Sequence, residues 1–285
     1  MLAIVGILVV FGSIIGGYLL EKGNLLVLVQ PAELVIIGGA ALGTLLVANP
    51  MHVVMDILKG LPTVMKGSKY SKAYFTETLK MMYDLFVYIR KVGPAAAEGD
   101  VEEPANSSVF SQYPKFLKDK HALHFVCDTL RTFSSGTVGH YDIDQIMEAD
   151  MEIHHHSTNI PIASLSTVAD SLPGLGIVAA VLGVVITMGA LGGPPEEIGH
   201  KVAAALVGTF LGILLCYGFV GPLASNMAKL NEEEGNYYQV LRTGVGSFVK
   251  GIAPLIAVEA ARRNIPHHVR PTYKEMDAAC RKAAG

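Results

Sequence analysis

The sequence contains no tryptophan and only three cysteines among its 285 residues. Cys127, Cys216 and Cys280 are far apart and Cys216 lies within an apolar run, so they indicate neither a disulfide framework nor a metal-binding knuckle. Without tryptophan, tyrosine must supply any aromatic belt at a membrane surface. The net charge of −3 gives no reason to expect nucleic acid as a partner.

Charged residues are also scarce, because they make up 16% of the chain whereas a soluble domain carries about 25%. The shortage is local, since long uncharged runs alternate with ordinary polar sequence. This alternation is typical of an all-α polytopic membrane protein. Four runs predict transmembrane helices, at residues 1–20, 31–49, 171–193 and 202–228.

The third run is the most informative of the four. From Ser171 to Gly193 no residue is charged, and a helix of that length measures about 35 Å, enough to cross a hydrocarbon core of about 30 Å. Small residues recur on it at helical spacing, as do Gly208 and Gly212 in the fourth run, and such faces let helices approach closely. We expect a packed inner wall, with Pro173 in the first turn, where a missing N–H costs least.

The other runs have distinct ends. No basic segment or cleavage site accompanies the first run, which stops at Glu21, so a retained helix is expected rather than a signal peptide. The second run has Glu33 at its mouth and ends at Pro50. Within the fourth run, Pro222 should kink the helix or mark its end.

The polar parts of the chain are also predicted to be helical. Residues 51–170 form a helical domain, because apolar side chains recur at helical spacing within 76–91 and within 123–133, and a third helix runs from about 142 towards 157. The segment between Pro94 and Pro114 is acidic and reads as a loop with short helical pieces. The tail, residues 229–285, contains one further amphipathic helix around 238–261.

Lysine and arginine are distributed unevenly, and this predicts the topology. Residues 51–170 contain eleven of them, the tail contains nine, and the two short connections contain only Lys22 and Lys201. Positive residues favour the cytoplasmic side. The large loop, the C-terminal tail and both termini are therefore expected to be cytoplasmic.

No arrangement of side chains predicts an enzyme, a metal site or a bound cofactor. The run His154-His155-His156 stands near acidic residues, but consecutive histidines on a helix point in different directions and cannot all ligate one ion. A solvated helix face is the favoured interpretation. Serine, cysteine and histidine are not arranged for nucleophilic catalysis, and no phosphate-binding loop is present.

The third and fourth runs lack any Asp, Glu, His, Lys or Arg within the hydrocarbon region. An ion route through a membrane normally needs an ionisable group. Either the protein moves no ions and its glycines serve self-association alone, or a partner helix supplies the titrating group.

A second open question concerns Arg90 and Lys91, which end a helix before an acidic segment. They are either ordinary complements of the helix dipole or part of an interaction surface.

Two long motifs resemble a known family. Residues 170–185 read Asp-Ser-Leu-Pro-Gly-Leu-Gly-Ile-Val-Ala-Ala-Val-Leu-Gly-Val-Val, and residues 207–223 read Val-Gly-Thr-Phe-Leu-Gly-Ile-Leu-Leu-Cys-Tyr-Gly-Phe-Val-Gly-Pro-Leu. Both are similar to the signature of the MotA family of flagellar motor stators. The likeness extends to the four spans, the large loop and the tail, so it covers the whole chain.

The resemblance implies a stator in the bacterial inner membrane, built as a pentamer around two copies of MotB. The single membrane helix of MotB carries the ion-binding aspartate, and MotB is anchored to peptidoglycan. By the same resemblance Arg90 and Glu98 contact the rotor protein FliG, with Asp100-x-Glu102-x-Pro104 supporting the register. Pro173 and Pro222 are implied to couple ion passage to conformational change.

The resemblance also bears on the transported ion. Thr209 matches the family's hydroxyl near the partner's aspartate, whereas Ala180 stands where sodium-driven relatives carry a second hydroxyl. Because sodium needs oxygens to replace its lost hydration, the methyl group of Ala180 favours protons. The alternative is an energiser of an outer-membrane process, of the ExbB/TolQ type. That group typically has three spans and a different loop, so the span count favours the stator.

Overall fold

The structure is a computed structural model that describes residues 2–189 and 191–281, and the described part of the chain is helical throughout, without strands. It divides into two compact units. The membrane unit comprises Met1–Gly67 with Ser157–Leu230, and the polar unit comprises Ser68–His156 with Asn231–Gly285. This division differs from the expected domains, because residues 51–67 and 157–170 group with the apolar helices. Most of the tail groups with the large loop, because the two share one core.

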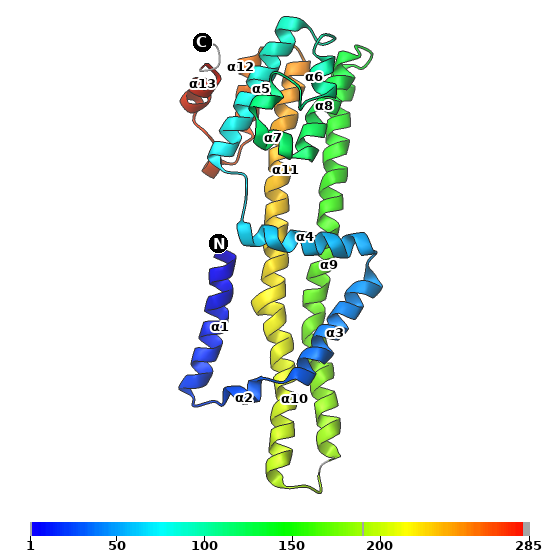
Figure 1. Cartoon of the computed structure of the whole chain (residues 1–285), viewed down its shortest axis with the longest axis vertical. Coiled ribbons are helices and arrows are strands. Elements are labelled where there is room, and N and C mark those ends of the chain that lie inside the picture. The colour runs from blue at the N-terminus through cyan, green and yellow to red at the C-terminus, as the bar shows by residue number, and fades with distance from the viewer. Residues whose placement is uncertain (1, 190, 282–285) are drawn as a thin grey trace. The chain divides into compact units, whose positions relative to one another are not determined.

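Four stretches of helix are long and apolar enough to cross a membrane, in agreement with the four predicted spans (Figure 1). The first is α1 (Leu2–Leu20), and the second combines α2 (Leu25–Leu28) with α3 (Pro31–Ala48). The third lies in α9 (His140–Met188), and the fourth in α10 (Pro195–Leu215) and α11 (Gly221–Val249). Of the residues predicted to lie in spans, residues 1 and 190 fall outside the described part.

The sequence predicts Pro173 in the first turn of a helix, and this prediction is wrong. Pro173 lies far inside α9, a continuous helix of 49 residues that also contains Pro161. A proline inside a helix removes the hydrogen bond to the carbonyl four residues earlier, here that of Ala169, at a cost of about 3 kcal/mol. The flanking residues Ala169 and Leu172 are 2% and 3% exposed. Their burial offsets the lost hydrogen bond, so the helix continues through the proline.

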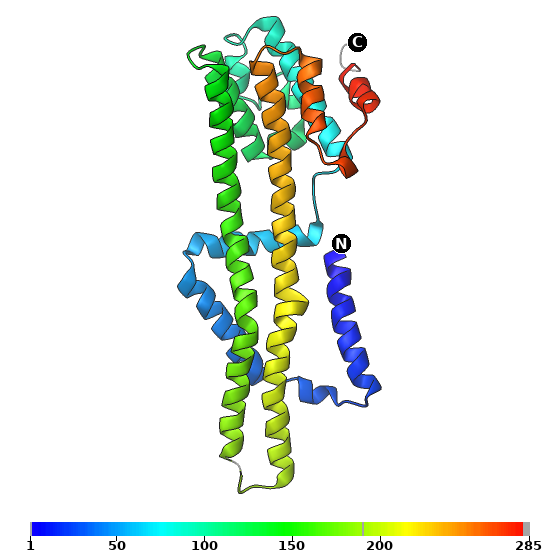
Figure 2. The same cartoon turned by 180° about the vertical axis from the view of Figure 1, so that it is seen from behind.

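Pro222 does not end the fourth helix either. A π-helical turn, Cys216–Val220, precedes it, and the Gly221 N–H donates to the Cys216 carbonyl, five residues earlier. Such a turn is one of the known ways in which a helix absorbs an irregularity. After it the helix continues as α11 to Val249, well beyond the predicted end at residue 228 (Figure 2).

The third and fourth spans approach each other at glycines. A Cβ added to Gly176 would lie 2.8 Å from the Gly208 carbonyl oxygen, and one added to Gly212 would lie 2.6 Å from the carbonyl oxygen of Leu172. These distances leave no room for a side chain, so the prediction of close packing is confirmed at these positions. The glycines of α1 and α3 differ, because a Cβ on Gly12 or on Gly39 would meet nothing within 4 Å.

Helix α4 (Met51–Lys66) lies crosswise to the spans of the membrane unit. Its residues fall into three stripes along the helix. Val53, Ile57 and Val64 are buried against a cluster that includes Ile162, Leu165, Ala224 and Met227. A second stripe is apolar but exposed: Met51, Met55, Leu58, Pro62 and Met65. The third is polar and exposed: His52, Asp56, Lys59, Thr63 and Lys66.

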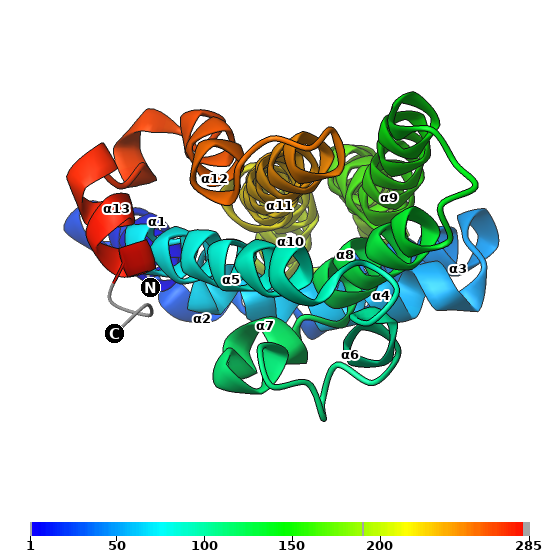
Figure 3. The ribbon, with the colours of Figure 1, turned by 90° about the horizontal axis from the view of Figure 1, so that it is seen from above.

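The polar unit is a bundle of long and short helices (Figure 3). Its elements are α5 (Lys72–Val92), α6 (Glu98–Glu102), η1 (Phe110–Gln112), α7 (Pro114–Lys118), α8 (Lys120–Ser134), α12 (Pro254–Arg263), η3 (His267–Val269) and α13 (Tyr273–Arg281), together with parts of α9 and α11. Helix α5 contacts both α12 and α13. On α5 the predicted apolar face is buried, and the Phe86 ring stacks on Phe248 of α11 at 4.4 Å between centroids.

The predicted single helix around residues 238–261 is wrong. Helix α11 ends at Val249, and α12 begins only at Pro254. Gly251 between them has a φ of +83°, a conformation that favours glycine, and proline is well placed at the start of a helix. Gly251 and Pro254 therefore separate α11 from α12, although the apolar pattern of the sequence continues across them.

Candidate functional site

The residues singled out by sequence lie in both units. Arg90 and Glu98 belong to the polar unit, whereas Pro173, Ala180, Thr209 and Pro222 belong to the membrane unit. Each group is described within its own unit.

Arg90 and Glu98 stand on either side of a tight turn. Helix α5 ends at Gly93, whose φ is +89° and whose N–H donates to the Ile89 carbonyl oxygen at 2.8 Å. Arg90 is exposed in the last turn of α5, and Glu98 is exposed as the first residue of α6. Within the described residues neither side chain forms an ion pair, so both charges are presented to the surroundings.

The turn that carries these charges is fixed to the rest of the polar unit. Tyr88 donates a hydrogen bond of 2.6 Å from its hydroxyl to Asp100 Oδ2, and Ser134 Oγ donates one of 3.1 Å to the Pro94 carbonyl. The hydrogen bond to Asp100 raises the pKa of Tyr88 above its ordinary value. Ala97 and Val101 are buried beneath the turn. Hydrogen bonds and buried side chains therefore hold the turn between Arg90 and Glu98 against the rest of the polar unit.

In the membrane unit, the neighbours of both prolines belong to one core. Leu172, next to Pro173, is buried in a cluster with Ile37 of α3 and with Cys216 of the π-helical turn. Val220, two residues before Pro222, packs against the same cluster. Each proline marks a point where a helix has lost a backbone hydrogen bond, and the two points share packing partners.

Ala180 and Thr209 lie on the facing helices α9 and α10. A Cβ on Gly208, which precedes Thr209, would lie 3.3 Å from the Ala180 nitrogen and 3.2 Å from the Ala179 Cβ. Both Ala180 and Thr209 are partly buried. The structure thus places Ala180 beside Gly208, the residue that precedes Thr209, and the role of both positions in choosing the ion stays a prediction.

Glu33 lies in surroundings that the sequence analysis does not predict. It was placed at the mouth of the second span, but its side chain is buried, with 6% exposure, and points to Gly208. One acidic residue inside an otherwise apolar run was an available signal, because such residues are costly in a membrane. The error came from equating a place near the start of α3 with a place near water.

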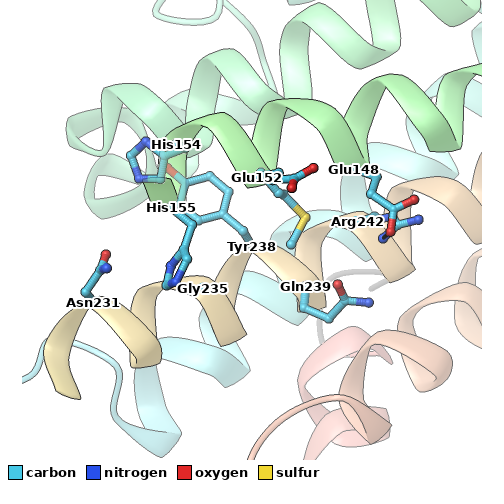
Figure 4. Close-up of a pocket in the computed structure, with 10 residues that line it drawn as sticks. Glu148, Glu152, His154, His155, Asn231, Gly235, Tyr238, Gln239 and Arg242 are labelled. Atoms are coloured by element: carbon cyan, nitrogen blue, oxygen red, sulfur yellow. Dashed lines mark ion pairs between the residues drawn. The ribbon is translucent and has the colours of Figure 1, made fainter. Parts of the chain in front are cut away.

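The polar unit contains a cavity of about 420 Å³ between α9 and α11 (Figure 4). In it His154 lies between His121 and Tyr238, with ring centroids 4.6 Å and 4.9 Å away, and its Nε2 is 3.8 Å from Glu234 Oε1. Burial acts to raise the pKa of Glu234, but His154, Lys69 and His121 together hold that pKa below its ordinary value. The expectation of a solvated face is wrong for His154, and it holds for His155, which is exposed.

The same cavity is bordered by structural ion pairs. Arg242 Nε lies 2.9 Å from Asp144 Oδ1, and Arg242 Nη1 lies 3.3 Å from Glu148 Oε1. Among the residues that the structure describes, no three histidine, cysteine or acidic side chains are grouped to hold a metal ion. These ion pairs tie α9 to α11 in the polar unit.

Comparison with known proteins identifies the family. Residues 4–93 match the motility protein A N-terminal family, and residues 118–239 match the MotA/TolQ/ExbB proton channel family. Motility protein A of Escherichia coli K12 is 41% identical over 97% of this chain and 94% of its own length. The chain belongs to the motility protein A family. Chemotaxis protein LafT of Vibrio parahaemolyticus is 34% identical over 95% of each chain.

Solved structures share the fold of this family member. The flagellar MotAB stator complex from Bacillus subtilis contains a chain that is similar with a TM-score of 0.72 and 21% identity, over 97% of this chain and 98% of that one. A chain of C. jejuni MotAB gives a TM-score of 0.75 at 18% identity, over 93% and 95%. Together with the four apolar helices, family membership makes this chain a multi-pass protein of the inner membrane.

Proposed function

We propose that the chain is a stator subunit of a bacterial flagellar motor, which conducts ions with a partner and converts their flow into torque. The observation that carries the proposal is the match over nearly the full length to motility protein A, at 41% identity. The absence of acidic residues from residues 171–193 and 202–228 agrees with it, because an ion path there needs a carboxyl group from elsewhere.

The partner is MotB, which supplies the ion-binding aspartate and the peptidoglycan anchor, and five copies of the chain surround two copies of MotB. Supporting this, the third span exposes a row of apolar side chains at helical spacing. Ile177, Val181 and Val184 are all more than half exposed, at 56%, 55% and 51%. A helix face of this kind has to be covered by lipid or by further subunits.

The transported ion is the proton. Ala180 presents a methyl group where a sodium path would need a further oxygen ligand, and its surroundings are the close-packed Ala179 and Gly208. Motor speed should therefore fall with a protonophore and persist without sodium. A motor that stops without sodium and tolerates the protonophore would overturn this assignment.

Torque passes to the rotor protein FliG through Arg90 and Glu98. Both are exposed and outside any ion pair among the described residues, and the Tyr88–Asp100 hydrogen bond steadies the turn between them.

Pro173 and Pro222 provide the compliant points of the two spans, because each lacks a backbone hydrogen bond and both adjoin one core. A change in the packing around one proline therefore alters the packing around the other.

Both termini and the large loop are cytoplasmic in this proposal. The support is the concentration of lysine and arginine in the large loop and tail, with one such residue in each of the two short connections. A cysteine placed at Lys22 or at Lys201 should react with a membrane-impermeant thiol reagent added outside the inner membrane, and one at Lys118 should not.

An ExbB/TolQ-like energiser is the alternative function. The match of residues 4–93 to the motility protein A N-terminal family and the four apolar helices favour the stator. A complementation experiment separates the two: the chain, expressed with its MotB-type partner in a strain that lacks its own stators, should restore rotation of tethered cells. Rings of this chain without MotB should conduct no protons, and flux through them would contradict the need for a partner.

A further inference from the structure

Glu33 carries a buried carboxyl group, one oxygen of which has no hydrogen-bond partner among the described residues. It is the third residue of α3, and its side chain is 6% exposed. Its Oε2 accepts no hydrogen bond from the described residues, and no ion pair there includes it. An acidic side chain in this condition inside a membrane is costly, and such residues usually have a function in ion movement.

The surroundings of the carboxyl group are built from small residues. A Cβ on Gly208 would lie 2.7 Å from Glu33 Oε2, so the glycine makes the space that the carboxyl group fills. The same Cβ would lie within 3.3 Å of Ala179 and Ala180 on α9. Glu33 and the backbone of Ala180 therefore both lie against Gly208, and this carboxyl group comes from the chain itself.

The carboxyl group also lies beside an apolar stretch of α9. Ala180 is eight residues from the last residue of α9, Met188, which corresponds to about 12 Å along the helix. At the same time Glu33 lies in the first turn of α3, where the free N–H groups of a helix favour negative charge. Burial favours the protonated carboxyl and the helix terminus favours the carboxylate, so the group is suited to take up and release a proton.

An open pocket, lined by apolar surface and by several charged side chains, lies one helical turn away from Glu33. Its volume is about 720 Å³, and it lies between the α2–α3 connection and the start of α10. Its lining includes Gln30, three residues before Glu33, and Ala204, four residues before Gly208. The titratable and charged groups that line it are Glu196, Glu197, His200 and Lys201, of which Lys201 and Glu197 pair at 2.9 Å.

We propose that Glu33 is a proton-binding carboxyl group of this chain, loaded from the cavity that Glu196, Glu197 and His200 line. The inference rests on the proposed function, because that function makes this cavity face the outside. A proton from the cavity forms an O–H bond at Glu33, and the same bond breaks when the proton moves on towards the partner's aspartate. Each subunit then holds one loading site in addition to the carboxyl group of the partner.

The first experiment measures proton flux through the complete complex in cells, with the partner's channel held open. Glu33→Gln keeps the size and the packing of the side chain but cannot bind and release a proton, so flux should fall at least about tenfold. Glu33→Asp should keep part of the flux. Glu21→Gln, which changes an exposed carboxyl group at the end of α1, is the matched control and should conduct normally.

The outcomes separate the two proposals. Flux at the wild-type level in Glu33→Gln overturns the role of Glu33 and leaves the stator function intact. A wild-type complex without proton flux contradicts the proposed function itself.

Infrared difference spectroscopy of the purified ring tests Glu33 without the partner and without flux. The C=O stretch of a protonated carboxyl group should be present in the wild type and absent in Glu33→Gln. A wild-type ring without this band, or a band that survives the substitution, overturns the proposal. Size-exclusion chromatography identifies a variant that does not assemble. If Glu33→Gln does not assemble, Glu33→Asp replaces it in the test. The frequency of the C=O band should then shift if the Glu33 carboxyl group is its source.

Discussion

The hydroxyl of Tyr88 on α5 donates a hydrogen bond of 2.6 Å to Asp100 on α6 and so closes the turn that carries Arg90 and Glu98. Removing the hydroxyl in Tyr88→Phe should cost about 1 kcal/mol locally and leave the fold intact. Torque should fall, because the two charges lose their fixed spacing, and hydrogen exchange in residues 93–103 should rise. Tyr273→Phe, at an exposed tyrosine of α13, is the control. Unchanged torque in Tyr88→Phe would show that the turn does not need this support.

Charge reversal at Arg90 tests the rotor contact directly. Arg90→Glu should reduce the swimming speed strongly, and a reversed charge on the rotor protein should restore part of it. Lys91→Glu is the matched control, because Lys91 is exposed in the same helical turn and is assigned no contact. If both reversals impair swimming equally, the effect comes from net charge and not from a specific contact.

Restoring a backbone N–H inside α9 should stiffen the helix. Pro173→Ala allows a hydrogen bond to the Ala169 carbonyl, so stators should assemble normally and produce less torque in a tethered-cell assay. Pro161→Ala makes the same change earlier in the helix and should leave torque nearly unaltered. Loss of assembly in Pro173→Ala would indicate that this proline is architectural.

The close approach of α9 and α10 predicts a difference between two glycines. In Gly212→Ala the new Cβ would lie 2.6 Å from the Leu172 carbonyl oxygen and 2.9 Å from Gly176 Cα, and backbone atoms cannot easily move aside. We expect a loss of about 1–3 kcal/mol, seen as a lower melting temperature of the ring in detergent. Gly39→Ala should melt like the wild type, because a Cβ there meets nothing within 4 Å. Equal melting temperatures for the two variants would contradict the packing.

An acidic residue in the tail predicts a dependence of stability on pH. Glu259 accepts hydrogen bonds from Arg262 and Arg263, at 2.6–2.8 Å, and the bonds from Arg262 lead in lowering its pKa from 4.5 to about 2. A lowered pKa in the folded state stabilises the protein above pH 4.5, and this contribution is lost as the pH falls from 4.5 towards 2.

Glu259→Gln should therefore destabilise the ring at neutral pH by about 2–3 kcal/mol. Its melting temperature should approach that of the wild type as the pH falls below 4.5. A difference that stays constant over this range would show that the carboxylate charge is not what stabilises the tail.

The four spans and the buried faces of α5 and α8 could be predicted from sequence, because each depends on a local pattern. Uncharged runs identify membrane helices, and the spacing of apolar residues identifies the side that faces a core. The family followed from two motifs that the chain itself contains. The role of Arg90 and Glu98 depends on partners, and it stays a prediction.

What could not be predicted depends on contacts between distant segments. The Glu33 side chain is buried because α3 packs against α10 at Gly208. No local sequence pattern predicts which helix α3 will pack against. The predicted first-turn position of Pro173 is wrong because a proline shortly after Asp170 resembles a helix start, whereas α9 continues through it with Leu172 buried. The tail joins the large loop because Phe248 stacks on Phe86, a contact between residues far apart in sequence.

The three stripes of helix α4 differ in their surroundings. One stripe is packed, one is apolar and exposed, and one is polar. Inserting a single residue within it would rotate every later side chain by about 100°, so that Met65 would trade places with a packed or a polar position. The number of residues in this helix is thus constrained by all three stripes at once, whereas a substitution affects only the stripe in which it falls.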